Sequence, residues 1–381
     1  MQVANFYTPT SGGLRIALDE LGRGYRQAGH ERVLIVPGPA ESVEQTPAGQ
    51  RITVRGLSLP GLGDYRILTG RRRVLRLLDA MPPDVLEVSD KISLGWLARW
   101  SRRHGVPLVL FSHERLDAIL LPRVPRWFPL RTAANIVNRR LSRLADRVIV
   151  TSAFSAAEFE RIGAPSVRRI PLGVDLATFR PEPEVPPCSA TSADPYGDRP
   201  VRLVTVTRLS REKRPENAID ALAALRDQGV DAALVVIGDG PHRRRLRRRA
   251  RGLPVTFLGH LSDRRAVAGL VAAADVALFP SPAETFGLAT LEALACGTPV
   301  VVPPEGAARE LLDGPGSGAV SDGTPSGMAD AVRGLLSIPA ARRRAAARAA
   351  AERYPWTETV AGLLRDYEVI GPADAEVSPS R

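Results

Sequence analysis

Short apolar segments alternate with amphipathic segments along most of this chain, and no other feature restricts its fold so strongly. Residues 3–7, VANFY, have the composition of a strand, and residues 14–29 follow with apolar residues at helical spacing. DVLEV at 84–88 and the helical pattern at 92–105 repeat the pair. Strands that alternate with helices pair in parallel and carry helices on both faces of the sheet. The sequence therefore predicts an α/β fold with doubly wound sheets.

A proline-rich stretch, PEPEVPPCSATSADPYGDRP at 181–200, interrupts this alternation. It has no apolar period and is typical of a linker. The chain of 381 residues is also too long for one ordinary core. We therefore expect two Rossmann-like domains that face a central ligand-binding cleft. The predicted boundaries are listed in chain order: first domain 1–180, linker 181–200, second domain 201–355, C-terminal helix 356–370, flexible tail 371–381.

The formal net charge of +11 requires anionic partners, and nucleic acid, anionic lipid and phosphorylated small molecules are all candidates. Aromatic residues make up only 5% of the chain, which disfavours nucleic-acid binding by base stacking. No apolar run approaches the length of a membrane span, and the first residues do not resemble a secretory signal. We expect a cytoplasmic protein, with peripheral attachment to the inner face of the plasma membrane as a candidate.

Two carboxylates, Glu284 and Glu292, lie between two apolar segments that have strand composition. The first strand ends near residue 280, so Glu284 falls in the loop at its carboxyl end, where open α/β sheets bind ligands. Glu292 falls within the following helix. Carboxylates accept hydrogen bonds from the hydroxyls of a diol. The alternative is that both are solvated charges, which are stabilised near a helix start.

The start of that helix is a candidate anion site. We place it near Phe286 or Gly287, and the first helical amides, near Gly287 and Leu288, have no intrahelical partner. A phosphate site with a carboxylate on each side suits a ligand that has sugars on both sides of its phosphates. A nucleotide sugar has that shape.

Other polar or small residues also follow predicted strands. Arg208 and Lys213 follow the strand at 201–207, and fixed cations there lower the barrier for departure of a nucleoside diphosphate. The simpler interpretation is an ordinary basic loop. Glycines 12 and 13 follow the first strand and let backbone approach a ligand closely. His113 follows the strand at 107–111, where a structural and a functional role are both open.

Together these residues resemble the retaining glycosyltransferases of family 4, which have the GT-B fold. That family has a Gly-Gly loop after its first strand, an R-x4-K pair and an E-x7-E motif, and all three have counterparts in this chain. Further matches are IPLGVDLATFRP, VVIGDGP and LEALACGTPVV. Many members have asparagine where this chain has Leu172. The final helical segment resembles family helices that cross back to the first domain.

The resemblance implies a role for each site residue. Arg208 and Lys213 would bind the donor diphosphate, Glu292 the ribose, and Glu284 the donor sugar. The remaining donor contacts would come from Gly12, Gly13, Phe286, Gly287 and Leu288, and His113 would lie beside the transferred sugar. The leaving phosphate would help to deprotonate the acceptor. The chain has no Asp-x-Asp triplet of the kind that metal-dependent GT-A enzymes carry, so no metal or other cofactor is expected.

A narrower resemblance points to the donor and the acceptor. QVANFYTPTSGGLRIALDELG, VLEVSDKISL and SHERLDAILLP are similar to mycobacterial and corynebacterial GDP-mannose-dependent α-mannosyltransferases acting on glycolipids. This implies a nucleotide sugar as donor and a glycolipid or small molecule as acceptor. Four alternatives stay open: a UDP-sugar donor with a small-molecule acceptor, a nucleotide-sugar 2-epimerase, a basic nucleic-acid-binding protein and a non-catalytic scaffold.

Two further stretches of the chain are rich in arginine. RRRLRRR at 243–249 is interpreted as a solvated helix face. Residues 119–131 combine Trp127 and Phe128 with three arginines, which suits an anionic lipid interface. The alternative for this second stretch is a buried loop.

Overall fold

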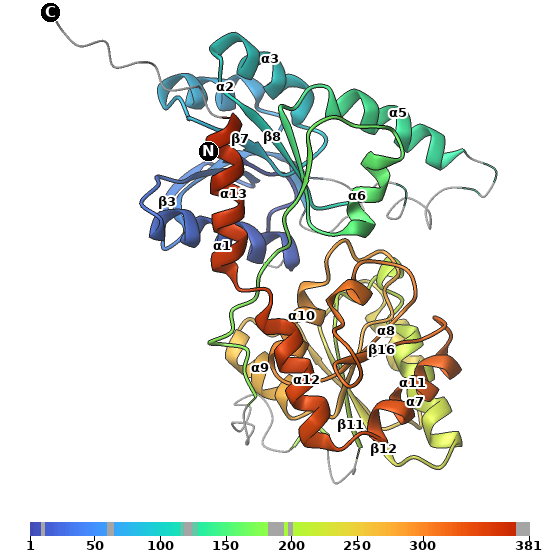
Figure 1. Cartoon of the computed structure of the whole chain (residues 1–381). Helices are drawn as coiled ribbons and strands as arrows, with labels where there is room; N and C mark the ends of the chain where they lie inside the picture. The colour runs from blue at the N-terminus through green and yellow to red at the C-terminus, as the bar shows by residue number, and fades with distance from the viewer. Residues whose placement is uncertain are drawn as a thin grey trace, which may run out of the picture. The chain divides into compact units, whose positions relative to one another are not determined.

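A computed structural model describes residues 1–8, 12–58, 65–115, 117, 125, 127, 129–181, 194–196 and 201–370. The chain divides into two compact units (Figure 1). Unit 1 combines the described residues up to Leu172 with the C-terminal helix that starts at Trp356. Unit 2 spans Gly173–Pro355.

Unit 1 is built on an eight-stranded sheet with the order β10-β9-β8-β7-β1-β2-β4-β3. All its neighbours pair in parallel except β3 and β4. A separate antiparallel pair is formed by β5 and β6. The strands are β1 Gln2–Val3, β2 Val33–Gly38, β3 Ser42–Thr46, β4 Gly49–Arg55, β5 Leu57–Ser58, β6 Arg66–Ile67, β7 Leu86–Val88, β8 Leu108–Ser112, β9 Arg147–Val150 and β10 Val167–Arg169.

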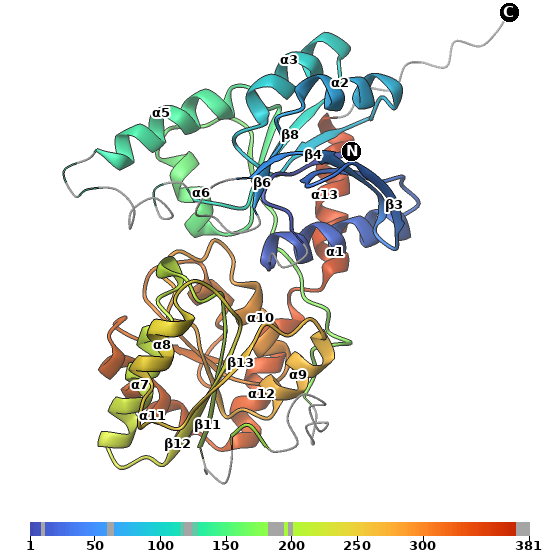
Figure 2. The ribbon, with the colours of Figure 1, turned by 180° about the vertical axis from the view of Figure 1, so that it is seen from behind.

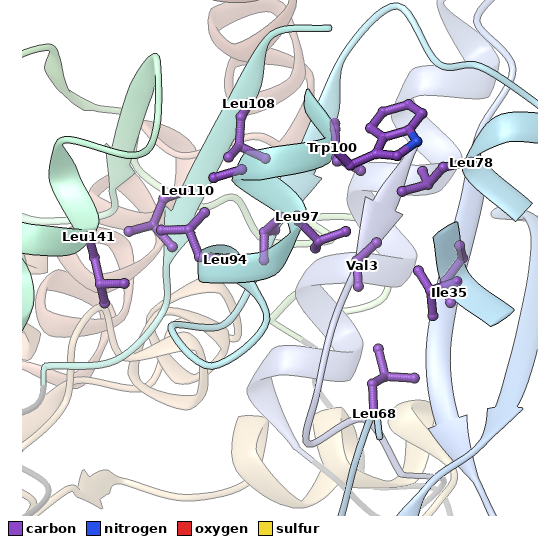
Figure 3. Close-up of a cluster of buried hydrophobic side chains, with 14 of the residues drawn as sticks. Val3, Ile35, Leu68, Leu78, Leu94, Leu97, Trp100, Leu108, Leu110 and Leu141 are labelled. Atoms are coloured by element: carbon purple, nitrogen blue, oxygen red, sulfur yellow. The ribbon is translucent and has the colours of Figure 1, made fainter. Parts of the chain in front are cut away.

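Helices cover both faces of this sheet, which explains why central strands such as β8 are buried along their whole length. The helices are α1 Gly13–Gln27, α2 Arg71–Ala80, α3 Leu94–His104, α5 Leu130–Ser142, α6 Ala153–Glu160 and α13 Trp356–Ile370. Figure 3 shows side chains of α2, α3 and α5 meeting those of the strands in one apolar cluster, which includes Val3, Leu78, Leu97, Leu110 and Leu141. On the opposite face, α1 buries Leu18 against Leu34 and Val36.

Unit 2 has a six-stranded, fully parallel sheet with the order β13-β12-β11-β14-β15-β16. Figure 2 shows α7, α8 and α11 on one side of the sheet and α9, α10 and α12 on the other. The strands are β11 Val201–Val206, β12 Ala232–Ile237, β13 Val255–Gly259, β14 Val276–Leu278, β15 Val300–Val302 and β16 Gly318–Val320. The helices are η2 Arg211–Lys213, α7 Glu216–Asp227, α8 Arg243–Arg249, α9 Arg264–Ala272, α10 Leu288–Ala295, η3 Ala308–Leu311, α11 Pro325–Leu336 and α12 Ala340–Glu352.

The segment that leads into the proline-rich stretch packs on unit 2. The units divide between Leu172 and Gly173, whereas the sequence placed the boundary at 180. Val174 donates its amide to the Tyr354 carbonyl at 2.9 Å, and Phe179 is only 1% exposed. Most of 181–200 lies outside the described residues, as does the predicted tail at 371–381. Within the stretch, the Tyr196 hydroxyl donates to the Leu270 carbonyl at 2.8 Å.

The C-terminal helix α13 packs against α1 in unit 1. Gly24 of α1 is needed there, because a Cβ atom at this position would clash with Val360 of α13. The same helix ends in a buried polar network. Tyr367 donates its hydroxyl to Glu87 Oε2 at 2.6 Å, and Tyr25 donates to the same oxygen at 3.2 Å. Burial raises the pKa of both phenols well above the usual value, so both stay protonated donors.

We predict that Tyr367→Phe lowers the free energy of unfolding by about 1–3 kcal/mol, because it removes one donor from the buried Glu87 carboxylate. Urea denaturation measures the change. Val369→Ala on the same helix is the matched control, since Val369 is 73% exposed. Equal stability of Tyr367→Phe and the wild type would show that this hydrogen bond does not hold α13 in place.

Candidate active site

The strand order of unit 2 changes direction at β11. From β11 the chain builds outward through β12 and β13, and it then returns to place β14 on the other side of β11. The two loops that leave the carboxyl ends of β11 and β14 are therefore neighbours. Open α/β sheets bind ligands at such a reversal point.

Lys213 and Glu284 meet at this point. Lys213 ends the short helix η2 after β11, Glu284 lies in the loop after β14, and Nζ is 2.6 Å from Oε1. Both side chains are about one-quarter exposed. Such an ion pair contributes only about 0–1 kcal/mol to stability. The fold therefore does not depend on the pair, and a ligand can replace either partner at little cost.

Arg208 lies in the same loop as Lys213 and is exposed. Its backbone is held on both sides, because Thr207 and Leu209 donate their amides to the Ile237 and Asp239 carbonyls, each at 3.0 Å. Glycine is required in the opposing loop. A Cβ atom at Gly238 would overlap the Thr207 carbonyl, and one at Gly240 would lie 2.6 Å from the Leu209 carbonyl. The VVIGDGP motif thus supports the loop that carries Arg208.

Helix α10 begins at Leu288, slightly later than the predicted start near Phe286 or Gly287. Gly287 precedes it with a φ of 97°, a left-handed conformation that side chains disfavour and that ends the loop. Phe286 is buried, and its ring lies edge-on to the Tyr354 ring with a centroid distance of 6.1 Å. The first amides of α10 therefore follow directly on the loop that carries Glu284, as an anion site requires.

Glu292 lies within α10 and is 9% exposed. Its Oε1 accepts a hydrogen bond from Arg264 Nη2 at 3.0 Å, and the Arg264 guanidinium lies 4.7 Å from the Phe179 ring centre. The sequence analysis missed Arg264 and Phe179, because neither is near Glu292 in sequence. The contact with Arg264 orients the carboxylate and balances its charge.

The loop that follows β15 contacts the backbone of Glu284. Ala307 donates its amide to the Glu284 carbonyl at 2.8 Å. Gly306 has a φ of 90°, and a Cβ atom there would lie 3.1 Å from the Pro282 carbonyl. The sequence analysis also missed Gly306, although the EGAAREL segment that holds it is separated from the end of β15 by two residues and its glycine was a usable signal.

The remaining predicted site residues belong to unit 1. His113 follows β8, and its ring stacks on Phe111 with a centroid distance of 4.3 Å. The residue as a whole is partly exposed, but Nε2 is buried, and burial lowers the pKa of His113 to about 3. The imidazole is therefore neutral at physiological pH. In that state it can polarise or orient a sugar hydroxyl but carries no charge toward a phosphate.

Gly12 and Gly13 are exposed at the start of α1. A Cβ atom at Gly12 would meet nothing within 4 Å, so packing within the protein does not require glycine at this position. In the unit 1 sheet, the strand order changes direction between β1 and β7. Asn5 donates through Nδ2 to Asp90 Oδ1 there at 2.9 Å. The sequence analysis did not single out either of these polar residues.

The basic and aromatic stretch at 119–131 is only partly described by the structure. Phe128 and most of 119–131 lie outside the described residues, but Trp127 is 82% exposed. Among the described residues, none of the helices combines the length and the apolar character of a membrane span.

Comparison with known proteins identifies the family of the chain. A family model described as Glycosyltransferase Family 4 matches residues 11–178, and one described as Glycosyl transferases group 1 matches residues 200–337. The chain is 47% identical to the GDP-mannose-dependent alpha-(1-6)-phosphatidylinositol dimannoside mannosyltransferase of Mycobacterium tuberculosis, covering 96% of this chain and 94% of that protein. It is 30% identical to the corresponding monomannoside mannosyltransferase of Mycolicibacterium smegmatis, covering 92% of each.

Among solved structures, sucrose-phosphate synthase from Thermosynechococcus elongatus superimposes with a TM-score of 0.76 at 21% identity, covering 97% of this chain and 98% of that one. The family models and the fold define a glycosyltransferase of the GT-B type, as the sequence predicted. The chain belongs to glycosyltransferase family 4.

The depressed pKa of His113 makes a prediction about acid stability. Its folded pKa, about 3, lies below the unfolded value of about 6.5, so the unfolded state binds the proton first. Stability should therefore fall as the pH drops below about 6.5, by about 2 kcal/mol at pH 5. Urea denaturation at pH 7 and pH 5 should show this loss in the wild type and a smaller loss in His113→Gln. The same pH dependence in both proteins would contradict the assignment.

Proposed function

We propose that this chain transfers mannose from GDP-mannose to a mannosylated phosphatidylinositol, with retention of the α configuration. The observation that carries the proposal is the meeting of Lys213 and Glu284 at the reversal point of unit 2, beside the start of α10. The names of the two mycobacterial relatives supply the donor and the acceptor class.

The cations at this point suit the departing diphosphate. Lys213 neutralises Glu284 without ligand. A donor diphosphate would draw the ammonium toward itself and leave Glu284 to accept a hydroxyl of the sugar. Arg208 in the same loop and the first amides of α10 would add to the stabilisation of the developing negative charge.

The rest of the donor is assigned by the chemistry of the side chains. Glu292 presents a buried carboxylate that Arg264 orients, which suits the two hydroxyls of a ribose. In the transfer, the bond between the sugar C1 and the phosphate oxygen breaks, and a bond from C1 to the acceptor oxygen forms. The acceptor proton passes to the leaving phosphate, and the products are GDP and the mannosylated lipid. Neutral His113 would orient the transferred sugar.

We predict mannosyl transfer from GDP-mannose that persists in EDTA, because the charge of the leaving diphosphate is balanced by protein cations. The assay supplies GDP-mannose or UDP-glucose with dispersed phosphatidylinositol mannosides and identifies the product by mass spectrometry. A rearranged nucleotide sugar formed without acceptor would favour an epimerase. Complete loss of activity in EDTA with recovery on adding manganese would overturn metal independence.

We also predict different kinetic effects for the two motifs. Lys213→Ala or Arg208→Ala should lower kcat about a hundredfold, which corresponds to roughly 3 kcal/mol, since these charges matter most as the diphosphate leaves. Glu292→Ala should mainly raise the donor KM, because ribose contacts persist from the bound donor to the transition state. Arg211→Ala removes a neighbouring exposed charge and should change neither value much. A Lys213→Ala enzyme with unchanged kcat and a raised KM would show that these roles are misassigned.

A further inference from the structure

Unit 1 carries a groove between α3 and α5. The C-terminal ends of these two helices come together, and Arg102 of α3 donates through Nη2 to the carbonyl of Arg143, which follows α5, at 3.1 Å. The groove has a volume of about 420 Å³. Six residues line it: Arg102, Ile136, Arg139, Arg140, Arg143 and Leu144. It includes none of the residues assigned above to sugar transfer.

The groove is strongly and locally cationic. Four of its six lining residues are arginines, and neither α3 nor α5 contains an Asp or a Glu. Within the part of the chain that the structure describes, the side chains of Arg139, Arg140 and Arg143 form no ion pair with a carboxylate. An external anion is therefore the natural partner of these guanidinium groups.

The equally basic helix α8 provides a contrast. There Arg243 pairs with Asp239 at 2.5 Å, and Arg249 pairs with Asp220. Arg247 lies over the Phe257 ring at 5.9 Å. Half of the arginines of α8 are thus engaged within unit 2. A high arginine content alone does not create a free cationic surface, and the groove differs because its charges are not balanced.

Apolar side chains lie beside these charges. Ile136 is 63% exposed and Val137 is 43% exposed on the outer side of α5. Trp127, which precedes the opposite end of α5 and does not line the groove, is also 82% exposed. A nucleic acid offers phosphates to arginine but no apolar layer to isoleucine and valine, and no aromatic residue lines the groove for base stacking. A bilayer surface offers both, with lipid phosphates above the acyl chains.

We propose that the α3–α5 groove docks the protein on an anionic bilayer, with lipid phosphates against Arg139, Arg140 and Arg143. Ile136 and Val137 enter the boundary between headgroups and acyl chains. The choice of a membrane as partner rests on the proposed function, because a phosphatidylinositol-linked acceptor stays in the bilayer. The groove itself takes no part in sugar transfer, so docking and catalysis are separable.

Flotation of the full chain with liposomes tests this proposal. The vesicles are phosphatidylcholine alone or phosphatidylcholine mixed with phosphatidylglycerol, at low salt. The wild type should float only with the anionic vesicles. Arg139→Gln/Arg140→Gln should lower the partition coefficient about thirtyfold, because each basic contact near an anionic surface contributes about fivefold. Arg244→Gln/Arg245→Gln removes the same charge from exposed positions of α8 and should float as the wild type does.

A second variant tests the apolar part. Ile136→Ser/Val137→Ser should also reduce flotation while the melting temperature stays unchanged, since both side chains are exposed. Equal losses for the two arginine pairs would show that net charge alone drives binding and would overturn the groove. Undiminished flotation of Arg139→Gln/Arg140→Gln would also overturn the groove. The proposal would likewise fail if the protein bound duplex DNA as tightly as anionic vesicles and the serine changes had no effect on flotation.

Transfer to a detergent-dispersed acceptor is measured on the same proteins. It should be unaffected by the arginine and serine changes, because the groove is separate from the reacting groups. Flotation without any transfer activity would refute the proposed function and leave the docking site standing. Transfer activity without flotation would refute the docking site alone.

Discussion

The parallel pairing of β11 with β14 is the constraint on which the candidate site depends. Leu203 pairs with Val276 and Val204 with Ala277, so two strands far apart in sequence end side by side. Both are packed between helices, and their carboxyl ends cannot move independently. The loops that follow must therefore meet, and Lys213 reaches Glu284. The site is a consequence of strand order, and the weak ion pair itself contributes little to holding it together.

Glycines then set the finer positions. Gly287 adopts a left-handed conformation that lets α10 begin immediately after the Glu284 loop, and Gly306 allows the next loop to support Glu284 from behind. Gly238 and Gly240 let a neighbouring loop lie against the backbone around Arg208. At Gly238, Gly240 and Gly306 one backbone segment lies against another at a distance that a side chain would prevent, whereas Gly287 is needed for its positive φ. The geometry of the candidate site is thus held mainly by the backbone.

The sequence predicted the layered α/β fold because strand and helix periods are local signals. It also placed Lys213 and Glu284 at one sheet edge, because parallel strands share their carboxyl ends. It did not show β3, whose residues SVEQT are almost all exposed and lack an apolar face. Nor did it show Arg264 beside Glu292 or Phe179 on unit 2, since both contacts join segments that no local pattern connects. The candidate site residues were thus accessible to sequence analysis, whereas the long-range contacts of Arg264 and Phe179 were not.

The net charge of a chain with so many arginines does not show where a binding surface lies, because some of the arginines form contacts within the fold. Arg32 is buried and spans Gln2 and the Leu18 carbonyl, with its pKa lowered to about 10 by burial. Arg348 donates to the Phe179 carbonyl and holds the entry to unit 2. These charges are satisfied within the fold and cannot attract a partner. What identifies a binding surface is a cluster of cations without carboxylates, next to apolar side chains that the fold leaves exposed. Only the combination of the two separates a membrane-facing helix from an ordinary solvated one.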